Sequence, residues 1–414
     1  MGAPTVRDIN RRYGALTAIA VGFAVLLLAG VAAFTLRTER SERFQAELAP
    51  FYTPPEPLPT GEPGRLIRVE PLMAAPSGSR GWRILYHSQD INGHDVPVSG
   101  MVFAPEGPAP AGGRPVVAWA HPTTGMSDSC APSRQTDPAA GLDWLSSMLA
   151  KGWVVTATDY ASLGTPGTLP YLIGTSAARD VLNSVRAAQQ IDGVGASERF
   201  ATWGHSEGGH ASLWAGALAP TYAPELRIVG TAAASPAAEL VALMQDQWDK
   251  LVAQVLGPYA VEGWAAWYPQ LEPSQVLAPN AVRALPTLAS ACLEELGLEA
   301  FVRVGLGRGF FSVDPTTVSA WAEVARQNSP GLPAATLPVF IANGTDDNVV
   351  LPATTTTLIS AYCTGGIAVT ADWMRGVGHP GAGNAAGDAA ISWIDDRFAG
   401  RPLTGQCGPA QPPT

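Results

Sequence analysis

The chain has 414 residues, of which 46% are hydrophobic and 14% charged, and its formal net charge is −10. This length and composition suffice for one large domain with insertions or for two ordinary domains, and they exclude a globally disordered chain. The acidic balance excludes a nucleic-acid-binding protein, because no stripe of basic residues is available to meet phosphates.

The N-terminal region contains an apolar segment long enough to cross a membrane. Gly14 to Leu36 is a run of 23 residues without a charge, and a helix rising about 1.5 Å per residue would span the roughly 30 Å hydrocarbon core. Arginines precede this run, so residues 1–13 are expected in the cytoplasm and the rest of the chain outside. We therefore predict a transmembrane anchor at 14–36 and an extracytoplasmic protein held at the cell surface. The alternative is a signal peptide cleaved after Ala33, which would release a secreted protein.

Four cysteines suit that oxidising compartment. Their spacing matches no metal-binding motif, so two disulfides with three possible pairings are expected rather than free thiols. The four are Cys130, Cys292, Cys363 and Cys407.

The folded region is expected to begin after a linker. Residues 37–64 run from a charged stretch into a proline-rich segment, which predicts an extended linker that wraps onto a domain. An antiparallel strand pair then opens the domain at residues 82–89 and 96–104, around the turn signal Asn92-Gly93.

Short apolar runs alternate with helical segments along the rest of the chain. The further predicted strands lie at residues 115–120, 153–158, 200–203, 226–232, 337–342 and 367–373. The predicted helices lie at residues 142–150, 174–190, 207–218, 350–361 and 384–398. This alternation indicates βαβ units, and hence an α/β fold with a mostly parallel sheet and helices on both faces.

One interval interrupts the alternation. Residues 235–335 are mostly helical in character, so we predict a helical cap inserted over the carboxyl edge of the sheet. The sheet domain would then comprise residues 65–234 and 336–414. The alternative is a separate domain with no part in the functional site.

The sequence Gly204-His205-Ser206-Glu207-Gly208 lies between a predicted strand and a predicted helix. A serine on a sharp strand-to-helix turn needs neighbours without side chains two positions away, and the turn exposes its oxygen above the sheet. The pattern therefore predicts a nucleophile elbow with Ser206 as the nucleophile. An incidental turn is the alternative in a chain with 44 glycines.

The partners of Ser206 follow from chain order. In this fold the order is serine, acid, histidine, and His379 is the remaining histidine beyond the elbow helix, in the glycine-rich loop 376–381 after the last predicted strand. The acid is expected in the loop after the strand at 337–342. We favour Asp347 over its neighbour Asp346, because it stands third after Gly344 with a valine pair just beyond.

An oxyanion needs two amide donors beside the serine. The Glu207 amide is one; the other is expected from Thr123 or Thr124, since Pro122 has no amide hydrogen. His121 is interpreted as bracing the same loop.

The motif His205-x-Glu207-x-x-His210 superficially suggests zinc. Two histidines five positions apart do not share a helix face, so no metal is predicted, and no cofactor either.

These features together resemble the secretory lipase family, lipase A type, within the α/β-hydrolases. The resemblance runs from about residue 51 to the C-terminus and includes the elbow and the region around Asp347. Its other motifs are Phe51-Tyr52-Thr53-Pro54-Pro55 with Pro63-Gly64, Cys130-Ala131-Pro132-Ser133, Asp159-Tyr160 and Leu163-Gly164. Typical members carry a cleaved signal, so the long N-terminal apolar segment departs from the family pattern.

The resemblance implies lipase or carboxylesterase activity and a helical lid inserted before the acid-bearing strand. It also implies the disulfides Cys130–Cys292 and Cys363–Cys407. The expected activity is hydrolysis of apolar acyl esters such as acylglycerols through Ser206, His379 and Asp347. The expected partners are a small-molecule or lipid ester and, through the N-terminal helix, a membrane. The alternatives are acyl transfer or amide hydrolysis on the same triad, or a non-catalytic envelope protein that binds a ligand.

Overall fold

The structure is a computed structural model that describes residues 39–142, 144–403, 407 and 411–412. The predicted membrane span at 14–36 and the predicted cytoplasmic residues 1–13 lie outside the described residues. Within the described part of the chain, no helix is both long and apolar enough to cross a membrane. The chain divides into two compact units, residues 1–51 and 52–414.

Residues 39–52 are helical, although the composition of 37–64 predicts an extended linker. The prolines that motivate the linker begin only at residue 50, and the preceding residues are good helix formers. A salt bridge of 3.5 Å between Arg43 and Glu39, one helical turn apart, supports this helix.

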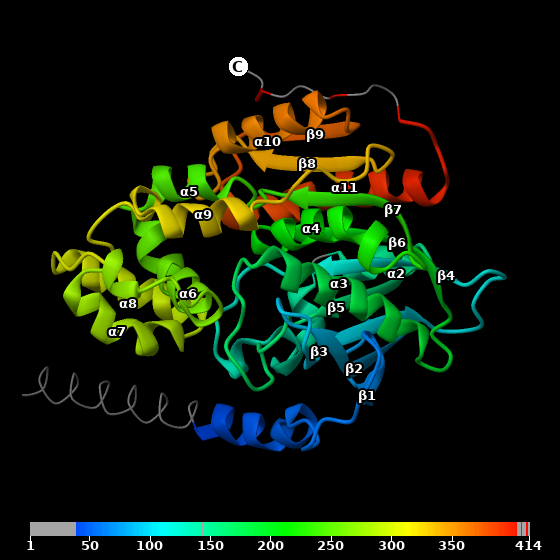
Figure 1. Ribbon diagram of the computed structural model, residues 1–414. Coiled ribbons are helices and arrows are strands. Elements are labelled where there is room, and N and C mark those ends of the chain that lie inside the picture. Colours follow the sequence, from blue (N-terminus) through cyan, green and yellow to red (C-terminus); the bar gives the residue numbers. More distant parts are fainter. Residues whose placement is uncertain (1–38, 143, 404–406, 408–410, 413–414) are drawn as a thin grey trace, which may run out of the picture. The chain divides into compact units, whose positions relative to one another are not determined.

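A nine-stranded sheet forms the centre of the second unit, in the order β1-β2-β3-β5-β4-β6-β7-β8-β9. The first three strands pair antiparallel and β3 pairs antiparallel with β5, while all later pairs are parallel. The sheet is therefore mostly parallel, as predicted (Figure 1). Its strands are β1 (Leu66–Leu72), β2 (Ser79–Gln89), β3 (Asp95–Pro105), β4 (Arg114–Ala120), β5 (Val154–Thr158), β6 (Ala196–His205), β7 (Arg227–Ala234), β8 (Val339–Gly344) and β9 (Val369–Met374).

Strand β1 has no counterpart among the predicted strands. It lies at the edge of the sheet, most of its side chains are partly exposed, and it contains Pro71. An edge strand tolerates proline and charge because one of its sides has no neighbouring strand. The continuous apolar run that reveals a buried strand such as β4 is therefore missing.

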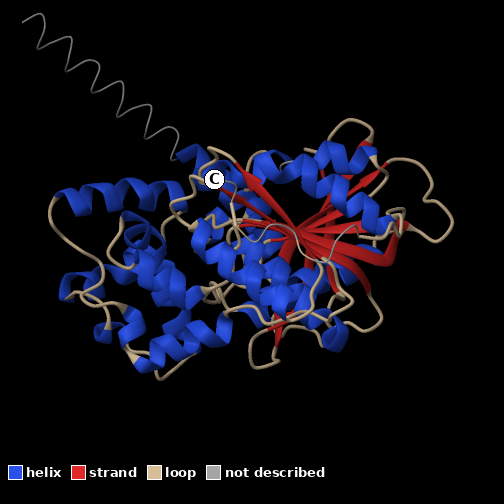
Figure 2. Cartoon of the chain, turned by 90° about the horizontal axis from the view of Figure 1, so that it is seen from above, coloured by secondary structure: helices blue, strands red, loops and turns tan. Residues whose placement is uncertain are grey.

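Helices cover both faces of the sheet (Figure 2). One face packs against α3 (Gly174–Gln189), α4 (Glu207–Tyr222) and α10 (Pro352–Thr364). The other packs against α2 (Leu145–Ala150) and α11 (His379–Phe398). Trp119 of β4 and Trp203 of β6 lie on this second face, with ring centroids 5.8 Å apart.

Helix α11 begins five residues before its predicted start and takes up His379, which the sequence analysis placed in a loop. The prolyl residue Pro380 occupies the first turn, where an amide hydrogen would have no helical partner in any case. The several glycines of this segment favour a loop from composition alone. The helix is stabilised instead by packing of its buried side chains against the sheet.

Five helices lie between β7 and β8. They are α5 (Leu240–Gln247), α6 (Leu251–Trp267), α7 (Pro279–Ala289), α8 (Leu293–Gly305) and α9 (Ser319–Asn328). We call them the helical insertion. They gather beside the sheet at the edge to which the arrowheads of β7 and β8 point, which is its carboxyl edge (Figure 1).

The helical insertion is joined to the loops of the sheet by polar and covalent contacts. The indole of Trp264 in α6 donates a hydrogen bond of 3.0 Å to the carbonyl of Tyr171. Cys292, just before α8, forms a disulfide with Cys130, and the neighbouring Leu293 amide donates to the Thr124 carbonyl at 2.9 Å. A second disulfide, outside the helical insertion, joins Cys363 to Cys407. Both pairs are those that the family resemblance implies.

Replacing Cys130 and Cys292 together by serine should lower the free energy of unfolding by about 2–4 kcal/mol, because the bridge closes a long loop in the unfolded chain. Denaturant unfolding without reductant measures this loss. The matched control is the double replacement of Cys363 and Cys407, which are 44 rather than 162 positions apart and should therefore lose less. An unchanged unfolding midpoint in the first variant would contradict the expectation.

Candidate active site

The turn between β6 and α4 holds Ser206 in a strained backbone conformation. Its φ of 58° and ψ of −117° lie in a region that side-chain-bearing residues rarely adopt. The Ser206 amide donates to the Ala234 carbonyl at 3.0 Å, and its carbonyl accepts from His210 and Ala237. Three backbone hydrogen bonds, one within α4 and two to the end of β7 and the residues just after it, thus hold the strained residue in place.

The two glycines of the motif are required by the packing around this turn. A Cβ atom at Gly208 would overlap the Ala120 carbonyl, and one at Gly204 would overlap the carbonyl of Gly208. The start of α4 therefore lies directly against the end of β4. This close approach places the Ser206 side chain at the carboxyl edge of the sheet, as a nucleophile elbow requires.

Ser206, His379 and Asp347 form one hydrogen-bonded line. The His379 Nε2 atom lies 2.9 Å from the Ser206 hydroxyl, and its Nδ1 atom lies 2.8 Å from Oδ2 of Asp347. When Nδ1 carries the proton, it donates a hydrogen bond to the carboxylate. Nε2 is then free to accept a hydrogen bond from the serine hydroxyl. All three residues are buried.

The loop after β8 distinguishes Asp347 from Asp346. Asp347 turns inward, and its Oδ1 accepts hydrogen bonds of 2.9 Å from the amides of Val349 and Val350. Asp346 is exposed and accepts from the Thr345 hydroxyl. Burial opposes ionisation of Asp347, but the hydrogen bond and charge of His379 outweigh it, so the pKa of Asp347 lies below its usual value.

The loop after β4 brings one of the two predicted threonines to this site. Thr123 lines the same cavity as Ser206 and His379, and its hydroxyl lies 2.8 Å from that of Tyr171. Thr124 does not line the cavity; its carbonyl accepts from Leu293 at the start of α8. The side chain of Glu207, whose amide is the other predicted donor, is buried next to Thr123.

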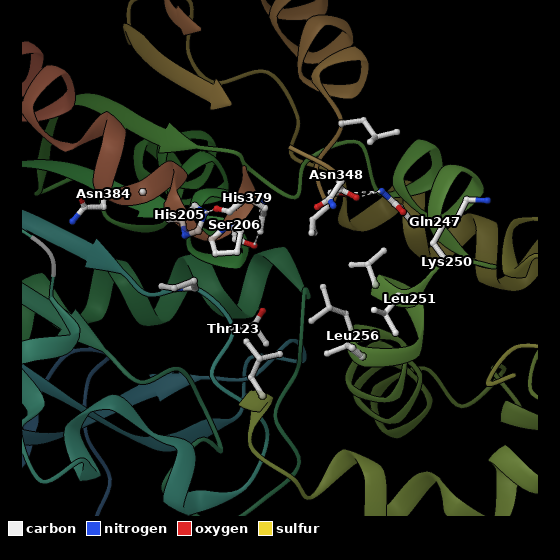
Figure 3. Close-up of a pocket in the computed structure, with 18 of the residues that line it drawn as sticks. Thr123, His205, Ser206, Gln247, Lys250, Leu251, Leu256, Asn348, His379 and Asn384 are labelled. Carbon is white, nitrogen blue, oxygen red and sulfur yellow. Dashed lines mark hydrogen bonds between the residues drawn. The ribbon is translucent and has the colours of Figure 1, made fainter. Parts of the chain in front are cut away.

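A cavity of about 790 Å³ opens above Ser206 and His379. In Figure 3 these two residues lie on one side, and Leu251 and Leu256 of α6 face them from the other. Gln247 at the end of α5 and Lys250 just before α6 also line the cavity, on the same side as these leucines (Figure 3). A second, smaller cavity of about 120 Å³ is lined by Ser206, Glu207 and apolar side chains of the helical insertion.

The other histidines near the site make separate hydrogen bonds to backbone carbonyls. His205 donates to the His379 carbonyl at 3.1 Å, and its ring lies 5.0 Å from the ring of His379. His210 donates to Ala237 at 2.9 Å, and His121 to Pro122 at 2.7 Å. Burial lowers the pKa of His205 and His210 to about 4. Across the described residues, no three histidine, cysteine, aspartate or glutamate side chains form a metal-binding group.

Two features of the site escaped sequence reasoning. The sequence indicates a role for the Glu207 backbone amide and gives no role to its side chain, which lies buried beside Ser206. The ring of His205 is hydrogen-bonded to the carbonyl of His379, a contact that no sequence motif indicates. The sequence does hold one signal that could have indicated this burial. Glu207 is a charged residue directly after Ser206, at a helix start that must pack closely against the sheet.

Comparison with known proteins supplies the family. The family model described as "Secretory lipase" matches residues 139–406, which is more than half of the chain. The chain is 28% identical over 376 residues to a Mycobacterium tuberculosis protein named "Probable inactive lipase MT1628", covering 86% of this chain and 83% of that one. It is 25% identical over 391 residues to Lipase 10 of Candida albicans, covering 86% and 82%.

Solved structures share the fold. Candida antarctica lipase A in its closed state superposes with a TM-score of 0.73 at 18% identity, covering 88% of this chain and 89% of that chain. The rice cell wall degrading esterase LipA from Xanthomonas oryzae superposes with a TM-score of 0.69 at 19% identity, covering 82% and 100%. The protein thus has the α/β-hydrolase fold.

Replacing Asp347 by asparagine should slow labelling of Ser206 by a fluorophosphonate by about 10³–10⁴-fold. The amide would stabilise the wrong histidine tautomer, as it does in a serine-protease triad. Mass spectrometry of the labelled peptide over time measures the rate. Asp346→Asn is the matched control and should label at the wild-type rate; a larger loss there than at Asp347 would show that the neighbouring carboxylate serves the histidine.

Proposed function

The chain belongs to the secretory lipase family, and from this premise we propose that it is an exported serine ester hydrolase acting on apolar acyl esters such as acylglycerols. The observation that carries the proposal is the hydrogen-bonded line from Ser206 through His379 to Asp347 beneath a cavity with apolar walls. A serine, a histidine and a carboxylate in this order and at these distances are the arrangement by which serine hydrolases activate a hydroxyl for attack on an acyl carbonyl.

In the proposed reaction the Ser206 oxygen attacks the ester carbonyl while His379 Nε2 takes its proton. The tetrahedral oxyanion is held by the backbone amides of Glu207 and Thr123, which lie at the helix start and in the loop after β4. The alcohol leaves with the proton from His379, and an acyl-serine remains. Water then attacks the acyl-serine with the same base, releasing the carboxylic acid and restoring the Ser206 hydroxyl.

The cavity supports an apolar substrate. Leu251, Leu256 and Leu293 of the helical insertion contribute to its walls, and a volume of about 790 Å³ accommodates a substrate of drug-like or lipid-like size. Burial of apolar ester chains against such walls favours binding by about 25 cal/mol per Å² of area removed from water.

Family membership by itself leaves a non-catalytic role open, because one relative carries the name of an inactive lipase. In this chain the proposed nucleophile, base and acid are all present and in hydrogen-bond contact, which supports catalysis. A binding protein would not need a serine held at a positive φ with a histidine 2.9 Å away.

Ser206→Ala should abolish both hydrolysis of p-nitrophenyl esters and fluorophosphonate labelling, since it removes the attacking oxygen from an otherwise unchanged turn. Initial rates across esters of graded acyl length, together with labelling, test this. A circular-dichroism spectrum equal to that of the wild type verifies the fold. Labelling that persists on another serine would contradict the nucleophile assignment, and a wild-type protein without label would favour the binding role.

We also propose that the protein acts outside the cytoplasm, held by a membrane helix at residues 14–36. Its support is the sequence of that segment, the secretory family and the two disulfides of the second unit.

The full chain should therefore sediment with membranes and resist carbonate extraction, whereas a chain beginning at Arg43 should remain in the supernatant and hydrolyse small esters equally well. All proposed catalytic residues lie in the second unit, which explains the unchanged activity. N-terminal sequencing of the exported protein is the decisive measurement. A mature protein that begins directly after Ala33 would mean that the segment is a signal peptide.

A further inference from the structure

The proposed reaction gives no role to Gln247, the last residue of α5. This glutamine is buried, with only 8% of the residue exposed, and it lines both cavities that Ser206 lines. Its Nε2 atom donates two hydrogen bonds, of 2.9 Å to the Asn348 carbonyl and of 3.0 Å to the Val349 carbonyl (Figure 3). A side-chain amide carries two hydrogens, so both of them hold the loop after β8.

The two carbonyls belong to the peptide groups that bind Asp347. The Asn348 carbonyl shares a peptide group with the Val349 amide, and the Val349 carbonyl shares one with the Val350 amide. These two amides donate to Oδ1 of Asp347, each at 2.9 Å. A trans peptide group is planar, and its carbonyl and amide point in nearly opposite directions. Gln247 and the Asp347 carboxylate therefore bind the same two peptide groups from opposite sides.

This arrangement strengthens the hydrogen bonds to the carboxylate as well as directing them. A carbonyl that accepts a hydrogen bond polarises its peptide group, so the amide of that group becomes a better donor. Hydrogen bonds to an ionised group are also stronger than those between neutral groups. Burial opposes the ionisation of Asp347, and the hydrogen bonds from His379 and the Val349 amide help to keep its pKa below the usual value.

Helix α5 is bonded to the nucleophile turn near its other end. The Ala237 amide, just before α5, donates to the Ser206 carbonyl at 3.2 Å, and the Ala237 carbonyl accepts from His210 at 2.9 Å. The Leu240 amide, in the first residue of α5, donates to the Ser329 hydroxyl at 3.1 Å. A helix of eight residues thus leads from the backbone of the nucleophile to the loop after β8.

We propose that Gln247 is a positioning residue for the catalytic acid: its two hydrogen bonds fix the peptide groups whose amides hold Asp347 against His379. This inference rests on the proposed ester hydrolysis. It gives the helical insertion a part in the chemical step, in addition to the walls that it contributes to the cavities.

Contact with the substrate is the competing role, because Gln247 lines both cavities. The two roles differ in their kinetics. A residue that binds the ester equally in the ground state and the transition state changes KM and leaves kcat unchanged. A displaced Asp347 lowers kcat instead, since its carboxylate stabilises the charge that forms on His379 during the reaction.

The test compares two variants of the full-length protein with the wild type on p-nitrophenyl butyrate. Gln247→Met fills nearly the same space with an unbranched side chain but has no donor. Its kcat should fall about 10- to 100-fold with KM nearly unchanged, because a small displacement of a catalytic group costs rate on this scale. Gln247→Asn keeps the amide but is one methylene too short to reach the carbonyls, so it should lose the same factor.

A double variant identifies the group through which Gln247 acts. Fluorophosphonate labelling of Ser206 should slow about 10- to 100-fold in Gln247→Met. Adding Gln247→Met to Asp347→Asn should cause no further loss, because the carboxylate that Gln247 positions is already absent. The direct readout is the far-downfield proton NMR resonance of the hydrogen between His379 Nδ1 and Asp347, which should shift or weaken in Gln247→Met.

The matched control is Gln275→Met, between α6 and α7. This glutamine also joins two segments, because its side-chain oxygen accepts a hydrogen bond of 3.1 Å from the Trp321 indole of α9. It lines neither cavity. The variant should keep the wild-type kcat, labelling rate and downfield resonance.

Each outcome decides the proposal. A wild-type kcat in Gln247→Met, a change in KM alone, an unchanged downfield resonance, or an equal further loss in the Asp347→Asn background would overturn it while the hydrolase function stands. A wild type that neither hydrolyses esters nor labels at Ser206 would overturn both. If Gln247→Met fails to fold, the smaller and polar Gln247→Asn decides through the same measurements.

Discussion

The close contact between the start of α4 and the ends of β4 and β6 is the constraint on which the site depends. At Gly204 and Gly208 there is no room for a Cβ atom, so the helix begins directly against the Ala120 carbonyl. Ser206 takes the strain of that contact in its backbone, with a φ of 58°. Such strain costs on the order of 1–3 kcal/mol and persists only where the surrounding structure over-determines it. Here the backbone hydrogen bonds of Ser206 to Ala234, His210 and Ala237 hold the strained conformation in place.

Asp347 reaches Ser206 from the loop after β8 and His379 from the first residue of α11, and the loops at these two places contact each other. The Asp346 amide donates to the Val377 carbonyl at 3.1 Å, and a Cβ atom at Gly344 would overlap the same carbonyl. The loop after β8 and the loop before α11 therefore form one support. This contact between the loops places the His379 ring between the Asp347 carboxylate and the Ser206 hydroxyl. The His205 side chain donates a hydrogen bond to the His379 carbonyl and so helps to fix its position.

The helical insertion contacts the loops that carry the site residues, which links the walls of the cavity to the geometry of Ser206, His379 and Asp347. Gln247 at the end of α5 donates to the carbonyls of Asn348 and Val349 in the loop after β8. Leu293 at the start of α8 donates to Thr124, beside the proposed oxyanion donor, and the disulfide of Cys292 reinforces this connection. A movement of the insertion would thus act on the loop after β8 and on the loop after β4 as well as on the cavity walls.

The sequence by itself determined the parts of this protein that depend on local spacing. The alternation of apolar runs and helical segments indicated the mostly parallel sheet, and Gly204, Ser206 and Gly208 marked the elbow. Tertiary structure alone decided the rest, because burial and hydrogen-bond partners depend on residues distant in the chain. It turns Asp347 inward and leaves Asp346 exposed, brings Thr123 rather than Thr124 to the cavity, and starts α11 at His379. It also buries the Glu207 side chain beside a cavity whose other walls come from the helical insertion.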